Sequence, residues 1–150
     1  MKIVIQRVTS ATVTIDNIVN GQIDTGMLIL LGIEHEDDQT DADWLIQKVI
    51  GLRIFSDSEG KMNLSVDDVN GAFLVVSQFT LHASIKKGNR PSYIQAARPE
   101  HAIPLYEYFI KTLKINSKKK VESGKFGADM KVNLLNDGPV TLIIDSKNRY

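Results

Sequence analysis

The stretch that decides the fold is a short apolar run, residues 27–33, which reads Met27-Leu28-Ile29-Leu30-Leu31-Gly32-Ile33. Every residue in it is apolar or glycine, so the run offers no polar face to solvent. A strand with this pattern is covered on both faces. The run therefore predicts an inner strand of a sheet that has material packed on each side.

Further strand-like segments lie on both sides of this run. Residues 2–15 are rich in Val, Ile and Thr and alternate in polarity, which predicts a strand pair at the start of the chain. Asp16-Asn17 and Asn20-Gly21 are typical of turns, so we expect the chain to reverse at these pairs. Residues 72–76 form a second apolar run and predict another buried strand.

Three more strands are expected, each next to a turn signal. Residues 53–55 predict a short strand that ends at the turn-forming residues 56–60. Residues 130–135 and 140–144 predict the last two strands, joined by a turn made of Asn136, Asp137, Gly138 and Pro139.

Two helices are expected between the strands. Thr40 or Asp41 can cap the first, in which Leu45, Val49 and Leu52 recur at helical spacing. The second helix carries an apolar stripe and contains Pro104, so it either bends there after a start at Pro99 or begins near Pro104. The stripe consists of Leu105, Phe109 and Leu113. This order of elements predicts an α/β fold, a mixed β-sheet with helices packed on one side.

Composition restricts the class of protein. A chain of 150 residues has the usual size of one domain, so we expect a single domain over residues 1–150. The absence of cysteine excludes disulfides, thiol nucleophiles and cysteine-bearing zinc sites. Lys2 interrupts the N-terminal apolar stretch too early for a signal peptide, and no apolar run approaches the ~20 residues of a membrane helix. We therefore expect a cytoplasmic protein without a membrane segment.

Charge restricts the partner. Lys plus Arg and Asp plus Glu both total 18, which gives a formal net charge of zero. Proteins that grip long nucleic-acid duplexes carry a basic excess, so we expect no DNA partner. Recognition of one RNA end by a local basic patch remains compatible with this balance. Two such patches exist, one formed by Lys86, Lys87 and Arg90 and the other by Lys118, Lys119 and Lys120.

Metal and phosphate sites are not indicated. His35, His82 and His101 are far apart in the sequence, and the acidic residues 34–38 suit a solvated loop before a helix. The segment Gly124-Lys125-Phe126-Gly127 lacks the spacing of a phosphate-binding P-loop and is interpreted as a flexible loop. We therefore expect no metal and no organic cofactor.

Two polar features could carry chemistry. Ser77 and Thr80 end an apolar strand, where small hydroxyl residues often only satisfy the backbone. A nucleophile would need a base within hydrogen-bond reach, and no histidine is obviously placed to serve. Gly138-Pro139 lies between two predicted strands, where it is either a structural turn or a rigid steric gauge without side chains.

Taken together, segments along the whole chain resemble the D-aminoacyl-tRNA deacylase family. Each is weak alone, but their order and spacing are specific. They are Val4-Ile5-Gln6-Arg7-Val8, Leu52-Arg53-Ile54-Phe55, Gly60-Lys61-Met62-Asn63, Ser77-Gln78-Phe79-Thr80-Leu81, Lys87-Gly88-Asn89-Arg90-Pro91-Ser92, Gly124-Lys125-Phe126-Gly127-Ala128-Asp129-Met130 and Asn136-Asp137-Gly138-Pro139-Val140-Thr141. The departures are His82, where relatives often have a larger residue such as tyrosine, and Pro104.

The resemblance implies a three-layer β/β/α fold and a homodimer that hydrolyses the ester between a D-amino acid, or glycine, and the tRNA 3′ end. It implies that Gly138 and cis-Pro139 reach into the partner subunit's pocket, exclude L side chains, and are held by Arg7. It also implies substrate contacts that line the pocket. These are Ser77, Gln78, Phe126 and Met130.

The resemblance favours catalysis by the backbone amides of Phe79 and Thr80 with help from the RNA 2′-OH. The Thr80 side chain as nucleophile is the competing mechanism. Two other functions are weighed against this one. A non-catalytic protein that binds RNA ends could keep the same scaffold, but the intact motifs speak against it. A small-molecule esterase would need a nucleophile with a histidine partner, which the sequence does not clearly offer.

Overall fold

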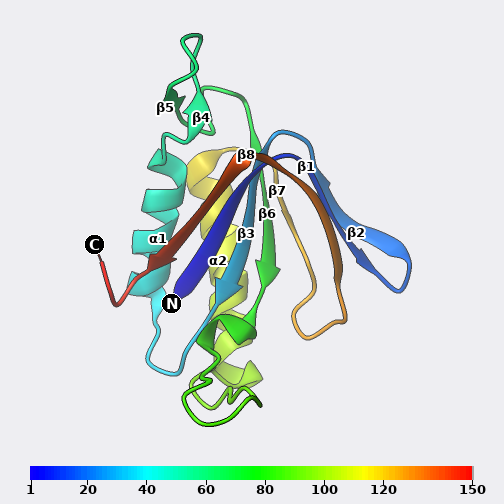
Figure 1. Ribbon diagram of the computed structural model, residues 1–150, viewed down its shortest axis with the longest axis vertical. Coiled ribbons are helices and arrows are strands. Elements are labelled where there is room, and N and C mark those ends of the chain that lie inside the picture. Colours follow the sequence, from blue (N-terminus) through cyan, green and yellow to red (C-terminus); the bar gives the residue numbers. More distant parts are fainter. Residues whose placement is uncertain (150) are drawn as a thin grey trace.

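The computed structural model describes residues 1–149 and is shown in Figure 1. A curved sheet stands beside two helices, and a small hairpin projects at one end (Figure 1). The elements follow in the order β1 (Lys2–Ile15), β2 (Ile18–Ile23), β3 (Gly26–Gly32), α1 (Gln39–Gly51), β4 (Phe55–Ser56), β5 (Met62–Leu64), β6 (Ala72–Ser77), the 3-10 helix η1 (Phe79–His82), α2 (Pro99–Ser117), β7 (Val121–Ser123) and β8 (Lys131–Asp145).

Strand β3 lies inside the main sheet, as its sequence predicts. The strand order is β2-β1-β3-β6-β7, and β8 pairs with β1 as well. Within this sheet β3 and β6 run parallel, whereas β1 is antiparallel to β2, β3 and β8. Ile29 at the centre of β3 is fully buried, with Ile5 opposite it on one side and Val75 on the other. The predicted inner strand is confirmed.

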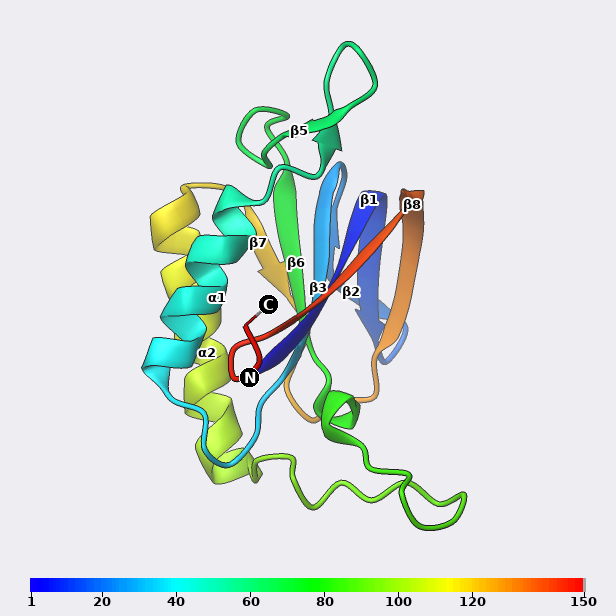
Figure 2. The same cartoon turned by 60° about the vertical axis from the view of Figure 1, so that its left-hand side comes forward.

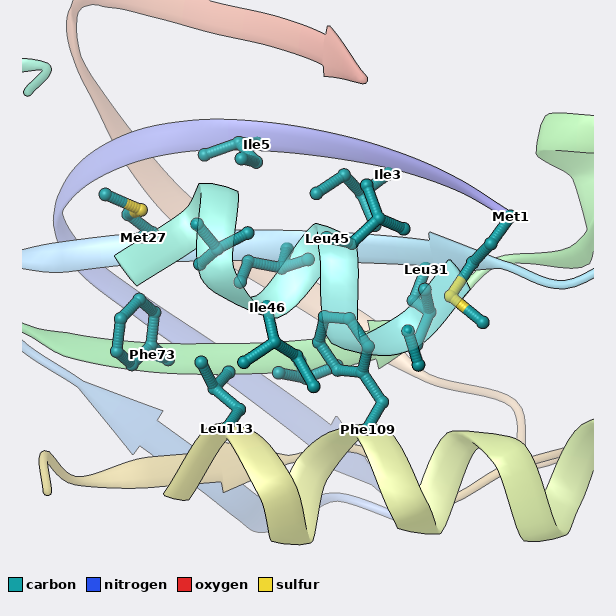
Figure 3. Close-up of a cluster of buried hydrophobic side chains, with 14 of the residues drawn as sticks. Met1, Ile3, Ile5, Met27, Leu31, Leu45, Ile46, Phe73, Phe109 and Leu113 are labelled. Carbon is teal, nitrogen blue, oxygen red and sulfur yellow. The ribbon is translucent and has the colours of Figure 1, made fainter. Parts of the chain in front are cut away.

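Both helices cover the same face of the sheet (Figure 2). The apolar stripes of α1 and α2 face inward, where Phe109 and Leu113 point toward Ile46 and the strands (Figure 3). These side chains are 0% exposed, and burial of each contributes about 1.5–3 kcal/mol. The predicted mixed sheet with helices on one side is confirmed.

A second apolar core lies on the opposite face of the sheet. The far half of β1 bends over with β2, so that β2 approaches β7. Side-chain bonds fix this approach, because Asn20 Nδ2 donates to the Ser123 carbonyl at 2.7 Å and Lys120 Nζ donates to the Gln22 carbonyl at 2.8 Å. The enclosed residues are Val8, Ala11, Val13, Ile23, Leu28, Leu74 and Val76.

The predicted opening pair is present, but its strands are arranged differently. Residues 2–15 form the single strand β1, which reverses at Asp16-Asn17 into β2. Both turn residues have positive φ, 49° and 62°, a conformation that Asn and Asp tolerate. The turn expected at Asn20-Gly21 is wrong, because these residues lie within β2, where the pairing with β1 is bulged nearby.

The expected turn at residues 136–139 is also wrong. Residues 131–145 form one continuous strand, β8, paired with β1 along most of its length. Asn136 pairs with Val8 and Thr141 pairs with Gln6, so the four residues 137–140 stand opposite the single residue Arg7. The polar segment therefore makes a large bulge in one strand rather than a hairpin between two.

The helix boundaries differ from those expected, for identifiable reasons. Asp38, not Thr40 or Asp41, caps α1, since its carboxylate accepts bonds from the amides of both later residues. Helix α2 begins with Pro99 at its first position and continues through Pro104, so a start near Pro104 is wrong. The short strand expected at residues 53–55 is shifted to Phe55–Ser56. No helix among residues 1–149 has the length and hydropathy to span a membrane.

Candidate active site at the end of strand β6

The polar motif predicted at residues 77–80 lies where β6 leaves the sheet. Ser77 ends the strand opposite Leu31 of β3, and the Gln78 amide donates to the Leu31 carbonyl at 2.8 Å. The chain then turns at once into η1, which starts at Phe79. The motif is thus fixed to the sheet on one side and opens a helical turn on the other.

The amides of Phe79 and Thr80 are the first two N–H groups of this turn. The first amides of a helix have no acceptor within it. No other backbone or side-chain oxygen of residues 1–149 accepts from either of them. Two neighbouring donors are therefore free to bind an oxygen atom that carries negative charge.

The Thr80 hydroxyl has an amide neighbour rather than a base. Gln78 Nε2 donates to Thr80 Oγ1 at 2.5 Å. The nearest histidine in sequence, His82, is 2% exposed and lies with Nδ1 3.8 Å from a carboxylate oxygen of Glu34. Because an amide nitrogen cannot accept the proton of the hydroxyl, the geometry does not equip Thr80 as a nucleophile.

A cavity of about 250 Å³ adjoins this motif. Segments 76–79 and 127–132 form its two walls, so residues fifty positions apart in sequence meet here. The phenyl ring of Phe79 is 53% exposed and meets the Tyr93 ring edge-on at 5.1 Å between centroids. The cavity is lined by Val76, Ser77, Gln78, Phe79, Gly127, Ala128, Met130 and Val132.

This cavity brings together most of the predicted pocket residues. Ser77, Gln78, Phe79 and Met130 all line it. Phe126 does not, because its ring lies on the other side of the loop between β7 and β8, 5.8 Å from the Tyr106 ring. Gly127 and Ala128 of the same motif take part instead, although neither was predicted to line the pocket.

Gly138-Pro139 and Arg7 form a second, separate group in the bulge of β8. The Gly138-Pro139 peptide bond is cis. Arg7 is 7% exposed and bridges two backbone carbonyls, with Nε 3.1 Å from the oxygen of Asp137 and Nη1 2.6 Å from the oxygen of Ile54. Its Nε also lies 3.2 Å from the Asp137 carboxylate. The arginine thus ties the bulge to the chain before β4.

Any residue larger than glycine at position 138 would displace Arg7 or Val140. Its φ is +126°, a backbone conformation that L side chains rarely adopt. A Cβ atom there would lie 2.9 Å from Arg7 Nη2 and 2.9 Å from Val140 Cγ2. The close approach explains why glycine stands opposite the arginine.

The bulge and the cavity lie toward opposite ends of the sheet. Val132 of β8 lines the cavity, whereas Pro139 is seven residues further along the same strand. Along the paired strand β1 the two positions correspond to Val13 and Arg7, and six residues at the ~3.3 Å rise of an extended strand span roughly 20 Å. In Figure 1 the bulge is near the upper bend of β8, whereas the loop after β7 is at the lower end. Pro139 therefore does not reach the cavity of its own chain.

The two basic clusters also lie at different ends. Lys86, Lys87 and Arg90 are exposed in the loop that follows η1, at the Ser77 end of β6. Lys119 and Lys120 lie beside the other end of β6, where they pair with Asp67 at 2.6 Å and Glu122 at 3.4 Å. Residues 1–149 contain no group of three or more His, Asp or Glu side chains placed to hold a metal ion.

Comparison with known proteins agrees with this fold along the whole chain. The model of the D-Tyr-tRNA(Tyr) deacylase family matches residues 4–145. A D-aminoacyl-tRNA deacylase from Flavobacterium psychrophilum is 61% identical over 149 residues, which cover 99% of each chain. The solved structure of the c-Myc DNA unwinding element binding protein has a TM-score of 0.90 at 40% identity, over 97% of this chain and 98% of that one.

A more distant solved structure shares the fold. A probable eukaryotic D-amino acid tRNA deacylase has a TM-score of 0.80 at 15% identity, over 95% of this chain and 97% of that one. The full-length matches therefore define a class of small proteins with one curved sheet and two helices on one face. The chain belongs to the D-Tyr-tRNA(Tyr) deacylase family.

Proposed function

We propose that this deacylase hydrolyses the ester between a D-amino acid, or glycine, and the 3′ end of tRNA, and rejects the L-amino acid ester. Family membership carries the proposal for the activity. The cavity at Ser77 is the candidate site for the amino acid and the terminal adenosine. The single observation that carries the proposed chemistry is the pair of unused amides at Phe79 and Thr80 beside that cavity.

The proposed reaction is attack of water on the ester carbonyl carbon. The carbonyl oxygen becomes negatively charged and accepts bonds from the amides of Phe79 and Thr80, each worth roughly 3–4 kcal/mol in the transition state. The bond to the ribose oxygen then breaks, and that oxygen takes a proton. The products are the free amino acid and tRNA. The ribose 2′-OH assists the transfer of a proton from the attacking water. We assign this role to the RNA because the neighbour of the Thr80 hydroxyl is the Gln78 amide and not a base.

Selection between D and L substrates is assigned to Gly138 and Pro139. We propose that two chains form a dimer in which the bulge of one chain faces the cavity of the other. The roughly 20 Å between Pro139 and its own cavity supports a contribution from a second copy. Carbonyl groups held rigidly by Arg7 would collide with an L side chain, yet leave room for a D side chain or hydrogen.

The experiment that tests selection compares two glycine substitutions. Gly138→Ala places a Cβ 2.9 Å from Arg7 Nη2, whereas Gly60→Ala also puts an L side chain at positive φ, +77°, but with nothing within 4 Å. We expect the first variant to lose hydrolysis of D-aminoacyl-tRNA or its preference over the L ester, and the second to keep both. Equal rates and equal preference in the two variants would contradict the proposed selection.

Complementation tests the contribution of a second chain. Ser77→Phe fills the cavity and Gly138→Ala disturbs the bulge, so neither variant alone should show D-selective hydrolysis. In a refolded mixture, half of the dimers would carry one intact cavity facing one intact bulge, and about a quarter of the wild-type rate should return. No recovery, although mixed dimers are detected by mass spectrometry, would refute an arrangement across subunits.

Thr80→Ala distinguishes the two mechanisms. We expect this variant to retain turnover within about tenfold, because the amide of residue 80 remains in place. Loss of turnover with unchanged folding and tRNA binding would instead support the Thr80 hydroxyl as nucleophile. Binding of aminoacyl-tRNA without hydrolysis by the unaltered chain would favour a non-catalytic protein that binds RNA ends. The proposal places the reaction in the cytoplasm and needs neither metal nor organic cofactor.

A further inference from the structure

A second cavity lies on the other side of the loop that forms one wall of the active-site pocket. It has a volume of about 600 Å³ and lies between α2 and residues 123–126. The aromatic rings of Tyr106 and Phe126 contribute apolar surface, and three lysines surround them. We call this cavity the lysine groove, and its lining includes Asn20, Tyr106, Lys111, Lys114, Lys125 and Phe126.

The three lysines of the groove have no carboxylate partner within the described part of the chain. No carboxylate of residues 1–149 lies within 4.0 Å of the Nζ atom of Lys111, Lys114 or Lys125. By contrast, Lys61, Lys119, Lys120, Lys131 and Lys147 each have a carboxylate partner within that distance. One acidic side chain, Glu107, lines the groove as well. The groove thus holds three lysines against one carboxylate, an excess of positive charge in a chain of zero net charge.

Local structure fixes the lysines around the groove. Lys111 and Lys114 are three residues apart in α2, so they lie on the same face of the helix. Lys125 comes from the facing loop, immediately before Phe126. The Tyr106 hydroxyl donates to the Val75 carbonyl at 2.9 Å, which anchors the helix face to β6. Burial raises the pKa of this hydroxyl, so it stays neutral and does not oppose an anion.

The groove is close to the proposed site of ester hydrolysis. Ser123 pairs with Val75, which is two residues before Ser77 and therefore about 7 Å from it along β6. Phe126 lies in the groove and Gly127 lines the pocket, so one loop separates the two cavities. A polymer bound with its terminal adenosine in the pocket would pass directly to the lysine groove.

We propose that the lysine groove binds the single-stranded 3′ end of tRNA through the phosphates that precede the terminal adenosine. This inference rests on the proposed function. Grooves that hold single-stranded nucleic acid combine basic side chains along the backbone with aromatic rings under the bases. Lys111, Lys114 and Lys125 contact phosphates, and the exposed side of Phe126 packs against a base. These residues position the substrate and take no part in bond cleavage.

The other basic clusters fit this role less well. Lys119 and Lys120 are occupied by carboxylate partners and lie at the opposite end of β6 from Ser77. Lys86, Lys87 and Arg90 lie at the correct end, but none of them lines one of the cavities described for residues 1–149.

The test removes the three charges of the groove and compares two substrates. The variant Lys111→Gln/Lys114→Gln/Lys125→Gln is matched by Lys48→Gln/Arg53→Gln/Lys61→Gln, which makes the same change of charge away from the groove. One substrate is D-aminoacyl-tRNA, and the other is D-aminoacyl-adenosine, which has no preceding phosphates. The rate is measured for both substrates over a series of salt concentrations.

The groove variant should raise the KM for D-aminoacyl-tRNA roughly tenfold and leave hydrolysis of D-aminoacyl-adenosine unchanged. Loss of three phosphate contacts should also reduce the slope of log(kcat/KM) against log[salt] by about 2. The control variant should resemble the unaltered chain in both respects. Equal KM values and salt slopes for the two triple variants would overturn the proposal.

A binding measurement separates this proposal from the proposed function. Fluorescence anisotropy is recorded with a short uncharged RNA that ends in the tRNA 3′ sequence. Weaker binding by the groove variant than by the control supports the groove even if no D-specific hydrolysis is found. If the ester is hydrolysed but both triple variants bind this RNA as the unaltered chain does, the groove proposal alone fails. Tighter binding of duplex DNA than of this RNA would also overturn it.

Discussion

Replacement of Arg7 by methionine would test how the bulge of β8 is held in place. Methionine keeps much of the apolar stem but removes every donor of the guanidinium. In the native chain these donors satisfy the carbonyls of Ile54 and Asp137 at 2.6 Å and 3.1 Å. The substitution therefore removes the hydrogen bond of the arginine to one buried carbonyl, that of Ile54, and to one partly buried carbonyl, that of Asp137.

The expected cost follows from these two contacts. An unsatisfied buried carbonyl costs about 1–3 kcal/mol, and loss of the partly buried bond adds roughly 1 kcal/mol. The free energy of unfolding should fall by about 2–4 kcal/mol. Arg53→Met is the matched control, since exposed Arg53 donates in a similar way to the Asn63 carbonyl at 2.7 Å. Water can replace that bond, so the control should lose less than about 1 kcal/mol.

Urea denaturation followed by circular dichroism measures both variants. With a slope of about 2 kcal/mol/M, the midpoint for Arg7→Met should fall by roughly 1–2 M, against less than about 0.5 M for Arg53→Met. Arg7→Met should also discriminate less between D- and L-aminoacyl-tRNA than Arg53→Met does. Equal midpoints and equal discrimination in the two variants would refute the role given to Arg7.

Three further predictions concern the scaffold. Phe109→Ala empties a fully buried position between the helices and the sheet, so urea denaturation should show a loss of about 3–5 kcal/mol. Tyr106→Phe should cost only about 0.5–1.5 kcal/mol by the same measurement, because the Val75 carbonyl also accepts from the Gly124 amide at 3.0 Å. Hydrogen bonds from the Thr40 hydroxyl and then the Asp41 amide lower the pKa of Asp38 below 3.8. The capping carboxylate therefore stabilises the fold above about pH 4, and this contribution is lost as the pH falls through the lowered pKa. Urea midpoints for Asp38→Asn should therefore vary less with pH below about pH 4 than those of the unaltered chain; an unchanged profile would contradict this reading.

Much of the scaffold could be predicted because its pattern is local. Residues 27–33 have no polar face, and the stripe of α2 recurs at helical spacing, so burial follows from the sequence. The bulge in β8 could not be found in this way. Gly138-Pro139 between two apolar stretches has the composition of a turn, and only the pairing of Gln6 and Val8 with the same strand distinguishes the two arrangements.

The site was predictable only in part, for a similar reason. Residues 77–80 form one local motif, and Met130 joins them as expected. The position of Phe126 depends on which side of the β7–β8 loop it takes, and its contact with Tyr106 is set by the packing of α2. The lysine groove combines two segments of the chain, so neither segment stands out alone as a basic cluster.

The central claim is that the chain releases amino acids from tRNA with selection for the D form. The most direct measurement is the rate of deacylation of D-tyrosyl-tRNA and L-tyrosyl-tRNA by the unaltered chain, with spontaneous hydrolysis of each ester subtracted. The account predicts release of D-tyrosine and no measurable acceleration for the L ester. No release of D-tyrosine at micromolar protein, or equal acceleration of both esters, would contradict it.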